Sequence, residues 1–349
     1  MIPLQFLAPV VIMGWLFAAC PAYTQTPYYQ GKTITVMQGR DPGGTGDMRA
    51  RAITQFLPKY IPGNPTIVHE YMPGRGGLRV ANQMYAANRP DGLTIGSVGA
   101  GMLSTPVLGE TGAKYDIAKF YYLGAPDSGG QYIFYTRKEI GVSSLEKLRS
   151  TPGIRIGAQS VGHSNYNIPR ILAYLLGMKE PRFVTGYASP EIDAAIMRGE
   201  LDGRMNQADS LLKNNLDWVE KGLVDFHVIL QIPKGVKHPR FGHIPEMESF
   251  ARSEIERKVV TLQRTFRMFG SPFVFPPATP KERVEILQEA MRKVFQDPLF
   301  PKEFKKLVGD VPDIVLPEVL EKSVKEIPRE PEVIELLKKL ASPDPLPPS

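Results

Sequence analysis

The sequence has 349 residues, of which 42% are hydrophobic and 22% are charged, with a formal net charge of +6. This length suits two domains better than one core, and the composition excludes a disordered or membrane-spanning chain. Lys and Arg alternate with Asp and Glu rather than forming a basic run, so a solvated, mildly basic surface is expected and a nucleic-acid partner is not.

The N-terminal segment is predicted to be an export signal. Residues 1–22 contain no charge, and the apolar run 4–19 is short for a membrane span. Cleavage after Ala22 would release a soluble periplasmic protein. Residues 16–20 also resemble a lipoprotein processing box in which Cys20 is lipidated, and a retained anchor is the third alternative. Cys20 is the only cysteine, so the mature body has no disulfide.

Segment 33–54 joins a predicted strand to a predicted helix through a glycine-rich loop. Residues 33–37 are β-rich, and apolar residues from Ile53 onward recur at helical spacing. Glycines such as Gly43 and Gly44 let the backbone turn tightly, and the first N–H groups of a helix have no internal partner. These groups favour a carboxylate or a phosphate, although many such junctions bind nothing.

A second segment repeats this arrangement halfway along the chain. Residues 154–158 read as a strand, residues 159–163 as a loop of mostly small residues, and residues 164–176 as a helix. Two such modules predict two lobes that face one ligand.

The order of elements predicts how these lobes are built. Strands near 33–37, 66–71 and 93–98, joined by helices, form a βαβαβ unit with a parallel sheet. Its ligand edge is the carboxyl end of the strands, where the loop 40–45 should lie beside Ser97 and Gly99. We expect lobe I to comprise residues 28–130 and 270–349 and lobe II residues 131–269. The C-terminal helices are expected to pack on lobe I or on the hinge.

Three partial motifs raise the question of an enzyme. Residues 126–130 match the Asp-Ser-Gly-Gly of chymotrypsin-type nucleophiles, but that fold is all β. Residues 99–104 half-match a dinucleotide fingerprint without its third glycine. His238 and His243 lie in a proline-containing loop without Cys or paired carboxylates. We therefore expect no catalysis, no cofactor and no metal.

Several motifs occur in a fixed order between residues 28 and 312, namely Pro42-Gly43-Gly44-x-x-Asp47, Pro73-Gly74-x-Gly76-Gly77, Pro90-Asp91-Gly92-x-Thr94, Gly157-x-x-Ser160-x-Gly162-x-Ser164, Gly199-Glu200-Leu201-Asp202 and Pro276-Pro277-Ala278-Thr279-Pro280. Together they resemble one family, the TctC-like or Bug receptors of tripartite tricarboxylate transporters. It implies a periplasmic binding protein type 2-like α/β fold, with two lobes that close around a ligand as a Venus flytrap does.

The resemblance also implies a function. A monomeric receptor would capture a small carboxylate and deliver it to a membrane permease of two unequal subunits. Gly43, Gly44 and Thr45 would form the anion clamp. Second-lobe side chains would select the other end of the ligand, namely Ser160, His163, Ser164, Asn165 and Tyr187. A binding protein that reports to a sensor kinase is the alternative, because a partner reads lobe closure in both cases.

Four charged or polar residues leave alternatives open. Arg40 stands where the family usually has an apolar stretch, so it either holds a carboxylate in a bidentate manner or pairs with Asp41 or Asp47. Asp47 is expected to cap its helix or pair with Arg51. His163 either contacts ligand or bonds its own backbone. Asp209 either faces the cleft, where it suits a hydroxyl or an ammonium group, or caps a surface helix.

Overall fold

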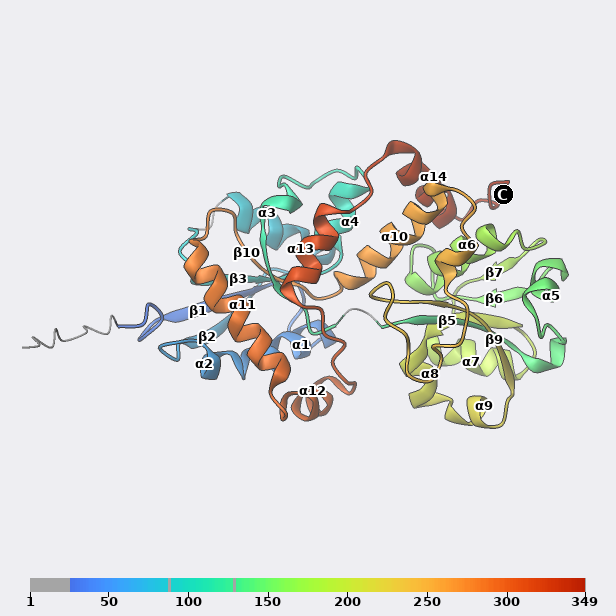
Figure 1. Ribbon diagram of the computed structural model, residues 1–349, viewed down its shortest axis with the longest axis horizontal. Helices are drawn as coiled ribbons and strands as arrows, with labels where there is room; N and C mark the ends of the chain where they lie inside the picture. Colours follow the sequence, from blue (N-terminus) through green and yellow to red (C-terminus); the bar gives the residue numbers. More distant parts are fainter. Residues whose placement is uncertain (1–25, 87–88, 128–129, 349) are drawn as a thin grey trace, which may run out of the picture.

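The computed structural model describes residues 26–86, 89–127 and 130–348 and shows two α/β lobes, each built on a five-stranded mixed sheet (Figure 1). The predicted fold class is therefore confirmed. The export signal and Cys20 lie outside the described residues. None of the described helices combines the length and the apolar character that crossing a membrane requires.

The sheet of lobe I begins with the predicted parallel unit. Its strand order is β2 (Thr66–Tyr71), β1 (Thr33–Gln38), β3 (Thr94–Ser97), β10 (Phe273–Phe275), β4 (Tyr121–Gly124). β1 pairs in parallel with β2 and β3, whereas β10 is antiparallel to β3 and β4. The carboxyl ends of β1 and β3 thus meet at one edge, and β10 brings a segment from late in the chain beside them.

Lobe II repeats this plan. Its strand order is β7 (Arg182–Val184), β6 (Arg155–Gly157), β8 (Gly203–Gln207), β5 (Tyr132–Arg137), β9 (Val224–Leu230). β6 is parallel to β7 and β8, and β5 is antiparallel to β8 and β9. The loop after β6 is the second predicted ligand loop, and it lies at the carboxyl edge of these parallel strands.

Helices cover both sheets. Those of lobe I are α1 (Thr45–Thr54), α2 (Leu57–Tyr60), α3 (Leu78–Ala86), α4 (Gly101–Val107), α11 (Lys281–Gln296), α12 (Phe300–Val308) and α13 (Pro317–Lys325). Those of lobe II are α5 (Leu145–Ser150), α6 (Ser164–Leu176), α7 (Ser189–Met197), α8 (Ala208–Asn214) and α9 (Leu216–Glu220). Short 3₁₀ turns are η1 (Arg75–Gly77), η2 (Ile117–Lys119), η3 (Lys138–Ile140) and η4 (Met247–Phe250).

A long helix, α10 (Glu254–Met268), lies between the lobes (Figure 1). Its N-terminus is capped by Ser253, whose Oγ accepts from the N–H of Glu256 at 3.2 Å. The sequence of this region is highly charged. One of its charged residues, Arg264, is buried in the helix and paired with Glu246 and Glu248 at 2.9 and 3.0 Å.

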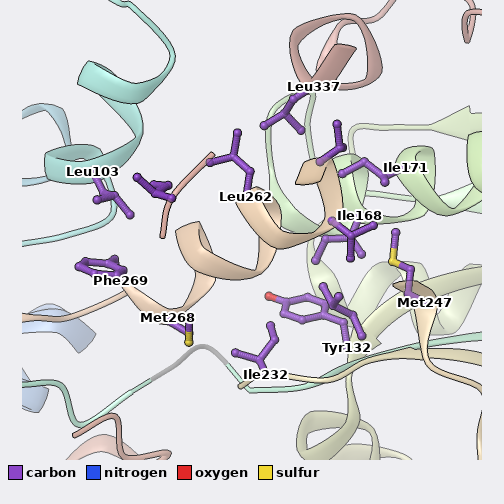
Figure 2. Packing of buried hydrophobic residues seen from close by; sticks show 14 of the residues in the cluster. Leu103, Tyr132, Ile168, Ile171, Ile232, Met247, Leu262, Met268, Phe269 and Leu337 are labelled. Atoms are coloured by element: carbon purple, nitrogen blue, oxygen red, sulfur yellow. The ribbon is translucent and has the colours of Figure 1, made fainter. Parts of the chain in front are cut away.

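One hydrophobic core runs along α10 from lobe I to lobe II. Figure 2 shows Leu262 and Phe269 between Leu103 of α4 on one side and Ile168 of α6 on the other. All four side chains are almost fully buried. Two further clusters fill the opposite faces of the sheets, one in each lobe. The lobes are thus joined by packed apolar side chains as well as by the chain itself.

The last helix, α14 (Pro331–Ala341), differs from our expectation for the C-terminal helices. Whereas α11 and α13 contact β4 of lobe I, α14 packs against α6 of lobe II and against α10. Arg170 of α6 fixes its end by donating to the carbonyls of Leu340 and Asp344, both at 2.6 Å. The boundaries proposed for the two lobes remain a prediction, and α14 bridges them.

Candidate ligand site between the lobes

The predicted first ligand loop is held in place by backbone segments that touch without side chains between them. A Cβ on Gly39 would lie 2.5 Å from Cα of Gly77, and a Cβ on Gly77 would lie 2.7 Å from N of Gly99. No side chain fits at such distances, so the ends of β1 and β3 and the turn η1 pack directly on one another. Gly77 also has φ of +91°, which favours glycine.

Arg40 lies at this junction and binds backbone carbonyls. Its Nη2 donates to the carbonyl oxygens of Val98 at 2.6 Å and Gly270 at 2.7 Å. Burial, and secondly the positive charge of Arg49, lowers the pKa of Arg40 to about 10, so the side chain remains charged at neutral pH. These hydrogen bonds go to backbone carbonyls rather than to Asp41 or Asp47, so the predicted pairing is wrong. Arg40 instead ties the β1 loop to the segment that returns from lobe II.

The glycine loop itself is organised by Asp47. Its carboxylate accepts from the N–H of Gly43 at 2.8 Å and from Nε of Arg51 at 3.1 Å, which confirms the predicted pairing with Arg51. The helix itself has no side-chain cap. Burial alone would raise the pKa of Asp47, but these hydrogen bonds outweigh burial and lower it. The N–H of Gly43 is therefore already used within the loop. Gly44 and Thr45 are exposed at the start of α1.

Ser97 and Gly99 lie at the predicted edge of the lobe I sheet, where their backbone atoms contact neighbouring segments. Ser97 is buried at the end of β3, and its carbonyl accepts from the N–H of Gly39 at 2.9 Å. A Cβ on Gly99 would lie 3.0 Å from the carbonyl oxygen of Gly76. Their predicted contact with ligand stays a prediction.

The second loop is closed by its own side chains. Asn165 is buried, and its Oδ1 accepts from the N–H of Gln159 at 3.2 Å. Nδ1 of His163 accepts from the N–H of Asn165 at 3.3 Å, so the predicted bond from His163 to its own backbone is present. Desolvation of the ring is the main reason that the pKa of His163 is lowered, which leaves it neutral at pH 7. Ser160 is exposed on this loop.

Ser164 is a predicted site residue that bonds to a side chain of α10, the helix between the lobes. It is the first residue of α6, and its Oγ accepts from Nη1 of Arg267 at 2.9 Å. Arg267 lies in the last turn of α10, with its guanidinium 5.2 Å from the centre of the Tyr132 ring. A positive charge thus lies between the two lobes, next to the second ligand loop.

The other two predicted residues lie farther from this point. Tyr187 is half-buried and packs against the outer apolar cluster of lobe II. Asp209 is the second residue of α8, and its Oδ1 lies 3.3 Å from Nε2 of His238.

Two hollows open between the lobes. The larger, which we call the cleft pocket, has a volume of about 440 Å³. It is lined by Ala100, Ser104, Leu108, Glu110, Gly162, Ser164, Asn167, Gln263, Phe266, Arg267, Leu337, Lys338, Ala341 and Ser342. The smaller, the rim hollow, has a volume of about 130 Å³ and includes Asp209, Arg49 and Asp127, the last two paired at 2.8 Å. Of the predicted site residues, Ser164 lines the first and Asp209 the second.

Sequence reasoning did not find the α10 residues of the cleft pocket. Gln263, Phe266 and Arg267 share one face of the helix because residues three and four apart are neighbours on its surface. This spacing is visible in the sequence, but it gains meaning only once α10 is known to lie between the lobes. Among the described residues, no group of three His, Cys, Asp or Glu side chains is arranged to hold a metal ion.

Comparison with solved structures identifies the fold. No family model and no curated protein sequence matches this chain. A TctC solute-binding protein from Polaromonas, solved without ligand, aligns with a TM-score of 0.66 at 14% identity, over 89% of this chain and 98% of its own. This chain has the TctC fold.

Two further structures with the TctC fold were solved with small acids. MatC from Rhodopseudomonas palustris, with bound malate, aligns with a TM-score of 0.50 at 19% identity over 99% of its length. R. palustris Rpa4515, with adipate, aligns with a TM-score of 0.51 at 17% identity over 97% of its length. Each alignment covers 89% of this chain. The resemblance expected from the glycine motifs is confirmed for the TctC fold.

Proposed function

We propose that this protein is a periplasmic solute-binding receptor of the TctC type that captures a small organic carboxylate. The observation that supports this most directly is the placement of Arg267 between the lobes, bonded to Ser164 and lining the cleft pocket. Two structures with the same fold hold malate and adipate. A guanidinium group is the side chain best suited to a carboxylate, because its planar N–H groups match the two oxygens.

In a two-lobed receptor, closure of the lobes is the change by which a partner protein recognises that ligand is bound. A ligand that contacts α4 from lobe I together with α6 and α10 is held more tightly when the lobes are closed, and it therefore shifts the population toward closure. We propose that a permease of the tripartite tricarboxylate type reads the closed state and takes up the acid. The role is capture and delivery, without a chemical step.

A screen for thermal stabilisation tests the proposal. The protein without residues 1–22 is heated with mono-, di- and tricarboxylates, aromatic acids and, as non-acid controls, the matching amides. A ligand at a hundred times its Kd adds about 2.7 kcal/mol to the free energy of unfolding, which a melting curve resolves. Stabilisation by an acid but not by its amide is the expected result. If no acid stabilises the protein, and mass spectrometry finds no co-purified acid, the proposed function is wrong.

The variant Arg267→Gln tests where the acid binds. We expect at least a tenfold rise in Kd by calorimetry, equal to about 1.4 kcal/mol, because the charge that meets the carboxylate is lost. Arg257→Gln is the matched control, since Arg257 lies on the same helix, pairs with Glu254 and is exposed. Equal affinity of wild type and Arg267→Gln would place the carboxylate elsewhere, for instance at Arg40 and the exposed N-terminus of α1.

A further inference from the structure

The cleft pocket is lined by both polar and apolar side chains. Arg267 and Ser164 meet where α10 and α6 approach each other, and Gln263 lies one turn before Arg267 on α10. Phe266 lies on the same face of the helix, and Leu108 and Leu337 line the pocket from α4's C-terminal end and from α14. Figure 2 shows Leu337 directed from α14 toward α10.

Gln263 adds hydrogen-bonding groups beside Arg267 and Ser164. It is 5% exposed and lines the pocket, and its side-chain amide can both donate and accept. A carboxylate held by Arg267 and the Ser164 hydroxyl would lie within one helical turn of this amide and could accept from it.

The remaining charges of the pocket do not form a second anion site. Lys338 and Glu110 both line it, but they are exposed and of opposite sign. A second carboxylate placed beside Phe266 and Leu337 would lie against apolar side chains and lose part of its hydration. The volume of about 440 Å³ is within the range of pockets that enclose a small organic molecule.

We propose that the cleft pocket selects monocarboxylic acids that carry an apolar body, aromatic or branched, over short dicarboxylic acids. The acid group binds Arg267, Ser164 and Gln263, and the body packs on Phe266 between α4 and α14. This selectivity rests on the proposed function, since it names the class of carboxylate that the receptor takes.

Calorimetry with two ligand sets tests the selectivity. The first set is phenylpropionate, indole acetate and isocaproate, and the second is succinate and malate. We expect the tightest acid of the first set to bind at least about tenfold more tightly than either dicarboxylate, the discrimination that a few buried apolar carbons provide. Phe266→Ala should weaken that acid about tenfold and leave the dicarboxylates within twofold, whereas Phe266→Leu should restore most of the affinity.

The control variant is Phe250→Ala. Phe250 is also half-buried and packs on the same core, but it does not line the pocket, so affinity should be unchanged. Dicarboxylates that bind as tightly as the apolar acids, or a Phe266→Ala variant that keeps full affinity for those acids, would overturn the selectivity while the receptor function stands. Failure of both ligand sets, with no other acid stabilising the protein, would overturn the receptor function itself.

Discussion

At the first ligand loop, Asp47 and Arg40 both bind backbone groups of the protein itself. That Asp47 serves its own helix was predictable, because an anion at a helix N-terminus is stabilised locally. Its bond to the N–H of Gly43 was not predictable, and it removes one donor from the expected anion clamp. For Arg40, the sequence indicated an unusual charge, but its two carbonyl partners lie 58 and 230 residues away in the chain. Contacts at such separations follow only from the assembled fold.

His227 gives a prediction about acid stability. It is buried on β9 with its Nε2 2.8 Å from Oγ1 of Thr136, and burial lowers its pKa from 6.5 to about 4. Between those pH values the unfolded chain binds a proton that the folded protein does not. Stability is therefore complete above about pH 6.5 and declines as the pH falls toward 4, by roughly 3 kcal/mol from this residue.

Urea unfolding at a series of pH values measures this effect. His227→Gln keeps a neutral polar side chain in place of the imidazole, so its stability should decline less than that of the wild type between pH 6.5 and 4. His69 and the carboxylates titrate equally in both proteins and cancel in the difference. Parallel stability curves for the two proteins would show that His227 is not the source.

At the scale of elements, α10 is the helix on which both lobes depend. Leu262, at its centre, is fully buried in the core that the lobes share. We expect Leu262→Ala to lower the free energy of unfolding by about 2–5 kcal/mol, the cost of removing buried methyl groups and leaving a cavity. Leu299→Ala is the control. Leu299 is 58% exposed, so its loss should change stability by less than about 0.5 kcal/mol, and similar losses in both variants would contradict the packing described here.

The elements divide into those that local patterns predict and those that they do not. Strands β1 and β6 and helix α6 follow from alternating or helical apolar spacing next to glycine loops, and α6 spans the predicted residues 164–176. The local pattern does not predict α10, because the charged residue Arg264 is buried on the inner side of the helix, where it pairs with Glu246 and Glu248. A charged residue at an inner position makes the sequence of the helix resemble that of an exposed segment. α14 has an ordinary amphipathic pattern, and nothing local indicates that its apolar face meets α6 rather than lobe I.

At the scale of the whole molecule, the shared core predicts how the protein unfolds. One cluster extends from α3 and α4 in lobe I through α10 to α6 in lobe II, so neither lobe can lose its packing without exposing apolar side chains of the other. We expect a single calorimetric transition whose van't Hoff and calorimetric enthalpies agree. Two resolved transitions, or a calorimetric enthalpy well above the van't Hoff value, would show that the lobes unfold independently.

The contact between Gly39, Gly77 and Gly99 makes the path of the chain depend on missing side chains. A Cβ on Gly39 or Gly77 would lie within 2.7 Å of neighbouring backbone atoms. A mutation at either glycine would therefore act on the spacing of β1, η1 and β3 together, and its effect would reach three segments that are far apart in the sequence.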